Sequence, residues 1–149
     1  MSEINRKDYA HWTEVPVRWG DVDRLGHVNN VQYFRYSEEA RTAWVNALSK
    51  GMNDVWGGGQ GPILAEIQCQ FIQQVHHPAT LQIGTRAVCL GNSSMQVNQG
   101  FFITGTDKPV ASSHSRIVWF DYQNQCSIPL PDLIRQRLRE IEHIAPIEA

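Results

Sequence analysis

The fold is decided by residues 17–41, which read V-R-W-G-D-V-D-R-L-G-H-V-N-N-V-Q-Y-F-R-Y-S-E-E-A-R. Val15 to Trp19 alternates between apolar and polar residues, as the end of a strand does. Gly20 to Asn30 is polar and contains two aspartates, two glycines, a histidine and two asparagines. From Val31 the pattern becomes helical. The stretch therefore predicts a strand, a tight loop and a helix N-terminus whose unpaired N–H groups and positive dipole end face the loop.

The segment after the loop has apolar residues at helical spacing, namely Tyr33, Tyr36, Ala40, Trp44 and Ala47. This spacing predicts an amphipathic helix over about residues 30–50, with Gly51 as its C-terminal cap. We interpret the aromatic stripe of this helix as core packing rather than as a cofactor site.

Five strands are predicted from alternating apolar and polar residues, over 12–19, 63–71, 81–89, 95–103 and 110–120. Short turns between the last four favour an antiparallel meander. Pro131 opens a short C-terminal helix with Leu133, Ile134, Leu138 and Ile141 on one side. Gly57–Pro62 lacks the Gly-Lys-Ser/Thr ending of a phosphate loop, and we interpret it as a turn near the site. The order predicts a single α+β domain over residues 1–149, with a five-stranded antiparallel sheet curled around one long helix.

The composition of the 149 residues is that of a folded globular protein, with 42% hydrophobic and 19% charged residues and a net charge of −2. No basic run suggests nucleic-acid binding, and no apolar run approaches the ~20 residues of a membrane span. The first eight residues do not resemble a signal peptide. Cys69, Cys89 and Cys126 have neither disulfide nor zinc spacing, so we expect buried thiols in a reducing compartment. These features favour a cytoplasmic enzyme or binding domain.

The element order and the string G-D-V-D-R-L-G-H-V-N-N-V-Q-Y resemble the hotdog-fold acyl-CoA thioesterases. The resemblance covers about residues 10–130 and is nearest to the 4-hydroxybenzoyl-CoA thioesterase branch, with its short-chain and long-chain acyl-CoA relatives. Where some members have Ile-Val-aromatic-aromatic after the glycine, this chain has His27-Val28-Asn29-Asn30. The resemblance implies a hotdog fold, no cofactor, and hydrolysis of acyl-CoA to a free acid and coenzyme A. It also implies a homodimer, doubled to a tetramer, with its sites at the dimer interface.

The resemblance assigns catalytic roles to two positions. Asp23 matches the catalytic carboxylate, and the backbone N–H of Asn30, seven residues on, matches the group that polarises the thioester carbonyl. The residue types suit this chemistry, because a thioester needs a nucleophile or base and donors for the oxyanion. The local sequence leaves open a second role for Asp23, as a turn or capping residue.

The neighbouring residues of the loop have alternatives as well. Asp21 fixes the loop through backbone hydrogen bonds or contacts substrate, and His27 either donates a proton or orients the loop. Asn29 or Asn30 caps the helix. Asp21, Gly26, Asn29 and Tyr33 form the predicted substrate-binding group.

Other polar residues receive weaker assignments. Glu38 and Glu39 offer a second base or lie on a solvated helix face. His76-His77 reads as a strand-end turn and His114 as a buried or interface histidine, so no metal site is predicted. The residues considered for the coenzyme A phosphates are Arg86, Lys108 and Arg116.

Two other functions compete with hydrolysis. The first is a hotdog hydratase or dehydratase acting on acyl thioesters, whose Asp-x-Asn-Pro-x-His signature is absent from the sequence. The second is a non-catalytic module that binds an acyl ligand.

Overall fold

The structure, a computed structural model, describes residues 3–53 and 55–148. The described residues form two α-helices, α1 (Asn30–Leu48) and α2 (Asp132–Ile141), and two short 3-10 turns, Arg6–Asp8 and Trp19–Asp21. The long strands are β1 (His11–Pro16), β2 (Gln60–Phe71), β3 (Thr80–Leu90), β4 (Ser94–Ile103) and β5 (Ala111–Asp121). Two-residue strands, β6 (Cys126–Ser127) and β7 (Ile147–Glu148), pair with β5 and β3. The predicted α+β order, with five strands and one long helix, is therefore confirmed.

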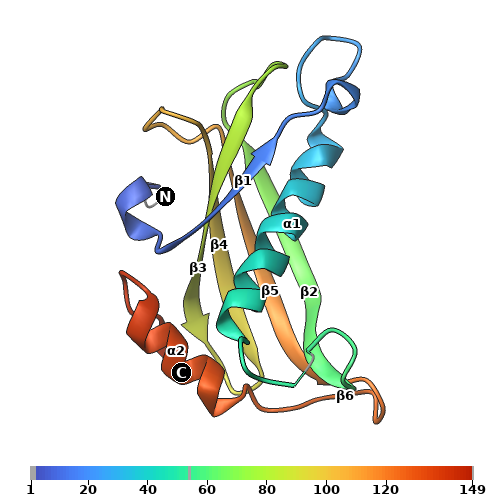
Figure 1. Ribbon diagram of the computed structural model, residues 1–149, viewed down its shortest axis with the longest axis vertical. Helices are drawn as coiled ribbons and strands as arrows, with labels where there is room; N and C mark the ends of the chain where they lie inside the picture. The colour runs from blue at the N-terminus through green and yellow to red at the C-terminus, as the bar shows by residue number, and fades with distance from the viewer. Residues whose placement is uncertain (1–2, 54, 149) are drawn as a thin grey trace.

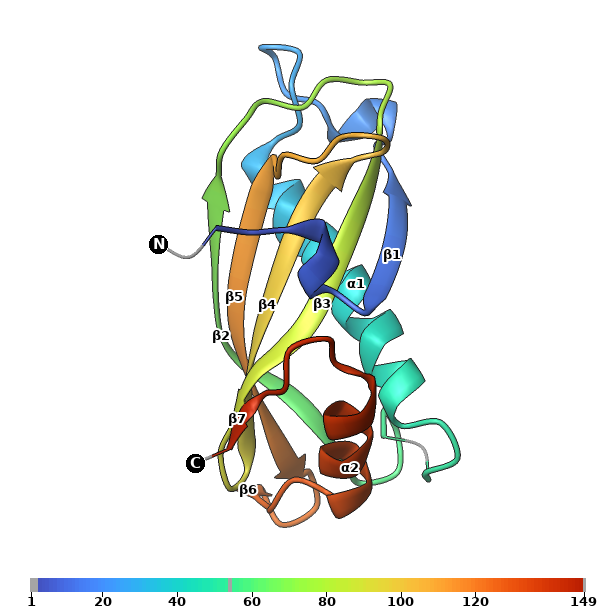
Figure 2. The ribbon, with the colours of Figure 1, turned by 90° about the vertical axis from the view of Figure 1, so that its left-hand side faces the viewer.

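The five long strands form one antiparallel sheet in the order β1-β3-β4-β5-β2, curled around α1 (Figures 1 and 2). The predicted meander is correct for β3, β4 and β5 but wrong for β2, which pairs with β5 instead of β3. β2 and β5 are both long and pair along their whole length. Alternation within a strand decides which side chains share a face, but it does not decide which strand lies alongside.

β2 is an edge strand, and most of its side chains are exposed in the single chain. A register shift between Leu64 and Glu66 also interrupts the alternation of Ile63, Ala65, Ile67 and Cys69. The prediction of a half-buried strand is thus wrong for the single chain, because β2 has a neighbour on one side only.

The concave face of the sheet is covered by α1 (Figure 1). Four of its five predicted core residues, Tyr33, Tyr36, Ala40 and Trp44, are buried, whereas Ala47 near the end of the helix is exposed. The helix ends at Leu48 with Ser49 as its cap, two residues before the predicted Gly51. Trp44 packs in an apolar cluster with Ile134 and Leu138 of α2. Leu133 and Ile141 are exposed, so the apolar side of α2 is narrower than predicted because this short helix is buried along a single stripe.

A polar group lies between the two ends of the core and fixes α1 on the sheet. The fully buried side chain of Gln99 on β4 accepts hydrogen bonds from Ser37 and Ser113, and donates to Thr85 and the Ser37 carbonyl. All four bonding positions of the amide are therefore used, which offsets the cost of burying it.

Three local predictions are corrected by the fold. The Gly57–Pro62 loop lies at the opposite end of α1 from the Asp23 loop (Figure 1), because nineteen helical residues span about 28 Å. His114 is exposed on the outer face of β5, so it is not buried in the single chain, and its alternative place at an interface stays a prediction. Cys126 is exposed in short strand β6, while Cys69 and Cys89 are partly buried, and all three are free.

Within the described ranges, no helix has the length and apolarity that a membrane span requires.

Candidate active site

The loop between β1 and α1 is a tight turn that sets Asp23 opposite His27. The Asp23 N–H donates to the His27 carbonyl at 2.9 Å, and the Gly26 N–H donates to the Asp23 carbonyl at 3.1 Å. Gly26 has φ +86°, a left-handed conformation that glycine adopts without steric cost. Val22 and Val28 form an isolated β-bridge that closes the base of the turn.

Asp21 anchors this turn to the helix. Asp21 is 7% exposed, and its carboxylate oxygen Oδ2 accepts hydrogen bonds from the Tyr36 hydroxyl at 2.5 Å and from the Arg18 N–H at 3.0 Å. Its carbonyl accepts the Asn29 N–H at 2.9 Å. Burial, together with the hydrogen bond to Asp21, raises the pKa of Tyr36. The same contacts end β1 at Pro16, before the predicted Trp19, because the chain turns to bring Arg18 to Asp21.

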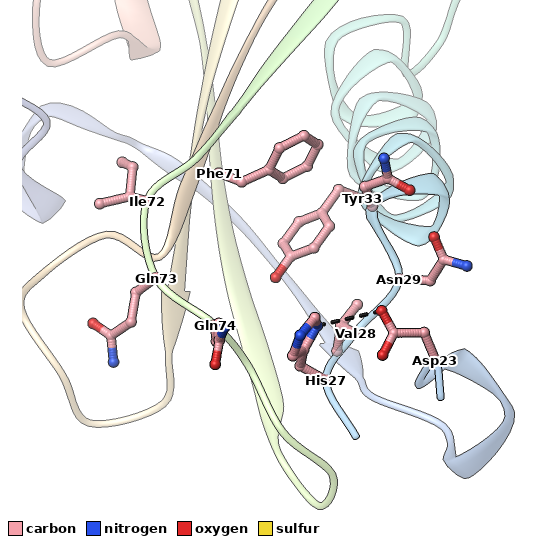
Figure 3. Close-up of a pocket in the computed structure, with 10 residues that line it drawn as sticks. Asp23, His27, Val28, Asn29, Tyr33, Phe71, Ile72, Gln73 and Gln74 are labelled. Atoms are coloured by element: carbon pink, nitrogen blue, oxygen red, sulfur yellow. Dashed lines mark ion pairs between the residues drawn. The ribbon is translucent and has the colours of Figure 1, made fainter. Parts of the chain in front are cut away.

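The Asp23 carboxylate is divided between two roles. Its Oδ1 accepts the Leu25 N–H at 2.9 Å, which is the turn role that the sequence left open. Its Oδ2 lies 3.4 Å from His27 Nδ1 (Figure 3), with the two side chains 29% and 23% exposed. One oxygen is therefore used by the turn, while the other faces a histidine on a partly solvated surface.

The N-terminus of α1 comes directly after the turn that contains Asp23 and His27. Asn29 is the N-cap, as predicted, and its Oδ1 accepts the Val31 N–H at 3.2 Å. Asn30 is the first helical residue, and its N–H has no acceptor among residues 3–53 and 55–148. This donor, at the positive end of the helix dipole, is available to an anionic oxygen.

A cavity of about 460 Å³ opens between this loop and the end of β2 (Figure 3). One wall comes from the loop and α1: Asp23, His27, Val28, Asn29, Asn30 and Tyr33. The other wall comes from the end of β2 and the residues after it: Phe71, Ile72, Gln73 and Gln74.

The two walls are fastened together below the cavity. The Val28 N–H donates to the Val75 carbonyl at 2.8 Å, and His76 Nδ1 lies 3.0 Å from the Gly26 carbonyl. The sequence placed His76 in a strand-end turn, and the contact across fifty residues had no local signal.

The cavity brings together five of the predicted site residues, Asp23, His27, Asn29, Asn30 and Tyr33. Asp21 and Gly26 do not line it, so their contact with a substrate stays a prediction. Phe71 to Gln74 were missed, since an alternating strand end carries no sign that it will face a loop far away in the chain.

The remaining polar residues lie elsewhere. Glu38 and Glu39 are exposed on α1, and the cavity lining contains none of Arg86, Lys108 and Arg116. Among the described residues, no group of three or more His, Cys, Asp or Glu side chains is placed to hold a metal ion.

Several solved structures are similar to this chain. The PA5185 protein of Pseudomonas aeruginosa has a TM-score of 0.83 at 26% identity, over 93% of this chain and 95% of its own. PA2801 of the same species, a candidate thioesterase, has a TM-score of 0.78 at 35% identity, over 87% of this chain and 98% of its own. A Thermus thermophilus thioesterase complexed with coenzyme A and zinc has a TM-score of 0.78 at 27% identity, over 92% of this chain and 97% of its own.

The match to the curated relatives spans about three-fifths to two-thirds of their length. They include the Arabidopsis thaliana chloroplast acyl-acyl carrier protein thioesterase ATL2, which is 22% identical over 74% of this chain and 59% of its own. The model of the thioesterase-like superfamily matches residues 17–138, which include the loop, α1, the long strands β2 to β5 and most of α2. The chain therefore belongs to the thioesterase-like superfamily and has the hotdog fold.

Proposed function

We propose that this protein is a thioester hydrolase that converts an acyl-CoA to the free acid and coenzyme A, with Asp23 as its catalytic carboxylate. The observation that carries the proposal is that the Asp23 carboxylate and the unpaired Asn30 N–H line one cavity. A carboxylate and an oxyanion donor are the two groups that thioester cleavage needs.

In the proposed reaction the thioester carbonyl oxygen accepts the Asn30 N–H. Asp23 then either attacks the carbonyl carbon, giving a mixed anhydride that water hydrolyses, or removes a proton from an attacking water. In both routes the C–S bond breaks, the sulfur leaves as the coenzyme A thiolate, and the thiolate gains a proton. His27, 3.4 Å from Asp23, is the nearby group that holds or passes this proton.

The thiol part of the substrate is proposed from the relatives. The Thermus thioesterase, at 27% identity, is complexed with coenzyme A, which supports an acyl-CoA substrate. The chloroplast relatives act on acyl carrier protein thioesters, which present the same reacting bond. We further propose a cytoplasmic location, which the three free cysteines support.

We also propose that the chain forms a homodimer, doubled to a tetramer. Phe71 and Ile72, at the end of edge strand β2, are 49% and 55% exposed. The same residues line the cavity. A partner that covers this edge would shield apolar surface and complete the wall of the site.

The test of catalysis is Asp23→Asn. This change keeps the shape of the side chain and the acceptor for Leu25 but removes the base, so kcat should fall by roughly 10²–10⁴. Glu39→Gln, an exposed carboxylate change on α1, is the matched control and should leave kcat unaltered. Near wild-type turnover by a folded Asp23→Asn protein would refute the mechanism. Turnover should also survive EDTA, since the proposed reaction uses no metal.

The same assay separates hydrolysis from the competing functions. Release of free thiol from a panel of acyl-CoA and acyl carrier protein thioesters identifies a hydrolase and its preferred donor. A change in acyl unsaturation without thiol release identifies a hydratase or dehydratase, and tight binding with neither identifies a binding module.

A further inference from the structure

Tyr33 is the one tyrosine of this chain whose hydroxyl has no hydrogen-bond partner in the described structure. All four tyrosines lie within the described ranges. The Tyr9 hydroxyl donates to Asn98, that of Tyr36 to Asp21 at 2.5 Å, and that of Tyr122 to the Pro62 carbonyl at 2.6 Å. Tyr33 as a whole residue is only 4% exposed, but its hydroxyl is not enclosed, so the cavity gives a ligand or water access to it.

The Tyr33 hydroxyl is directed into the cavity. Figure 3 shows it in the space between His27 and the Phe71–Gln74 wall. The ring is held from several sides, with centroid distances of 5.1 Å to Phe71, 6.0 Å to Phe101 and 6.1 Å to Tyr36. A ring fixed in this way presents its hydroxyl at a defined position in the free protein, as a preorganised binding group does.

The position of Tyr33 relates it to the acyl part of the substrate. It lies three residues after Asn30, which places both on the same face of α1, one turn apart. With the thioester carbonyl at the Asn30 N–H, we assign the side toward buried Tyr33 to the acyl group, because coenzyme A is large and charged and stays in solvent. Gln73 and Gln74 add amide groups to the opposite wall.

The space beyond Tyr33 is filled. Tyr36 and Phe101 are fully buried between α1 and the sheet, and the Ser37–Gln99 hydrogen bonds lie behind them. A long alkyl chain therefore cannot continue between α1 and the sheet without displacing core side chains.

We infer that the Tyr33 hydroxyl donates a hydrogen bond to an oxygen of the acyl group, so that the site selects short acyl groups that carry a hydroxyl or oxo substituent. This inference rests on the proposed thioesterase activity and specifies its substrate class. Burial raises the pKa of Tyr33, which keeps the phenol protonated and able to donate at neutral pH. A substrate whose acyl group lacks this oxygen leaves the Tyr33 hydroxyl without a hydrogen-bond acceptor, and the site therefore disfavours it.

The experiment compares matched esters that differ by one oxygen, 3-hydroxybutyryl-CoA with butyryl-CoA and 4-hydroxybenzoyl-CoA with benzoyl-CoA. The wild-type protein should prefer the oxygenated member of at least one pair by roughly tenfold in kcat/KM. Tyr33→Phe should reduce kcat/KM for the oxygenated ester roughly tenfold more than for its partner. Tyr122→Phe, which removes a hydroxyl outside the cavity lining, should keep the wild-type preference.

Two results would overturn the inference. One is a wild-type protein with no preference in either pair, and the other is an equal loss on all four esters in Tyr33→Phe, which would assign the hydroxyl to the shared thioester group. If the wild-type protein releases thiol neither from these esters nor from the wider acyl-CoA and acyl carrier protein panel, the proposed function fails. The Kd values of the same four esters for wild-type and Tyr33→Phe protein then decide whether the hydroxyl selects the oxygenated acyl group.

Discussion

Two aspartates separated by one residue have different environments in the same loop. Asp21 is buried, with its carboxylate bonded to Tyr36 and to the Arg18 N–H. Asp23 is partly exposed and lines the cavity. A buried carboxylate with its bonds satisfied stabilises the loop, whereas a partly exposed one with a free lone pair is available for chemistry.

Asp21→Asn should destabilise the fold more than it impairs the chemistry. Both hydrogen bonds go to Oδ2, so the amide keeps that acceptor only without its charge, and it puts an NH2 donor in place of Oδ1, which has no donor or acceptor partner among the described residues. The free energy of unfolding should therefore fall by about 1–3 kcal/mol. Urea denaturation measures this, with Glu39→Gln as a control expected to stay within about 0.5 kcal/mol of wild type. If folded Asp21→Asn loses more turnover than Asp23→Asn, the catalytic carboxylate has been assigned to the wrong member of the pair.

At the scale of the elements, the C-terminal segment seals the part of β3 that β1 does not reach. β1 pairs with β3 only as far as Thr85. Beyond it, Glu142 at the end of α2 accepts the Ala87 N–H at 3.0 Å, and β7 pairs with Cys89 and Leu90. Burial raises the pKa of Glu142 to about 7, against the lowering effects of the Ala87 N–H, Arg86 and His143. The docking of α2 thus includes a carboxyl group that takes up a proton at higher pH than an ordinary glutamate does.

Glu142 should make the stability of the fold depend on pH. Because its folded pKa, about 7, lies above its ordinary value of 4.5, the folded protein binds more protons than the unfolded chain between these values. The contribution of Glu142 to stability is therefore full below about pH 4.5 and is lost as the pH rises through about 7. Urea midpoints between pH 5 and 8 should fall less steeply in Glu142→Gln than in wild type. Glu140→Gln, an exposed residue of α2, should keep the wild-type slope.

For the whole molecule, the unequal edges of the sheet matter most. β1 forms one edge and is short, whereas β2 forms the other with twelve residues. Ile63, Leu64 and Phe71 of β2 and the adjacent Ile72 are exposed hydrophobic residues. A long exposed strand with apolar side chains favours pairing with another chain.

A charge on this edge should therefore break the assembly. We expect light scattering of the wild-type protein to give twice or four times the mass of one chain, and Leu64→Lys to shift it toward the monomer. Leu133→Lys, at an exposed leucine of α2, should leave the mass unchanged. An active wild-type monomer would contradict the proposed dimer.

The sequence by itself determined the features that depend on neighbours in the chain. The helical spacing of Tyr33, Tyr36, Ala40 and Trp44 identified α1 and its buried side, because a helix face is a local property. The run from Asp21 to Asn30 predicted the tight loop and the N-cap, because turns and caps use side chains that bond within a few residues.

Only the tertiary structure decided which distant segments meet. It put β2 beside β5, and it brought Phe71 to Gln74 opposite Asp23 to form the second wall of the cavity. It also buried the Tyr33 ring while leaving its hydroxyl without a partner among the described residues, whereas the sequence had placed this residue both in the core stripe and in the predicted substrate-binding group. Periodicity records which side of an element is apolar, but the partner of each side chain depends on how the sheet curls around α1, and that is set by the packing of the whole chain.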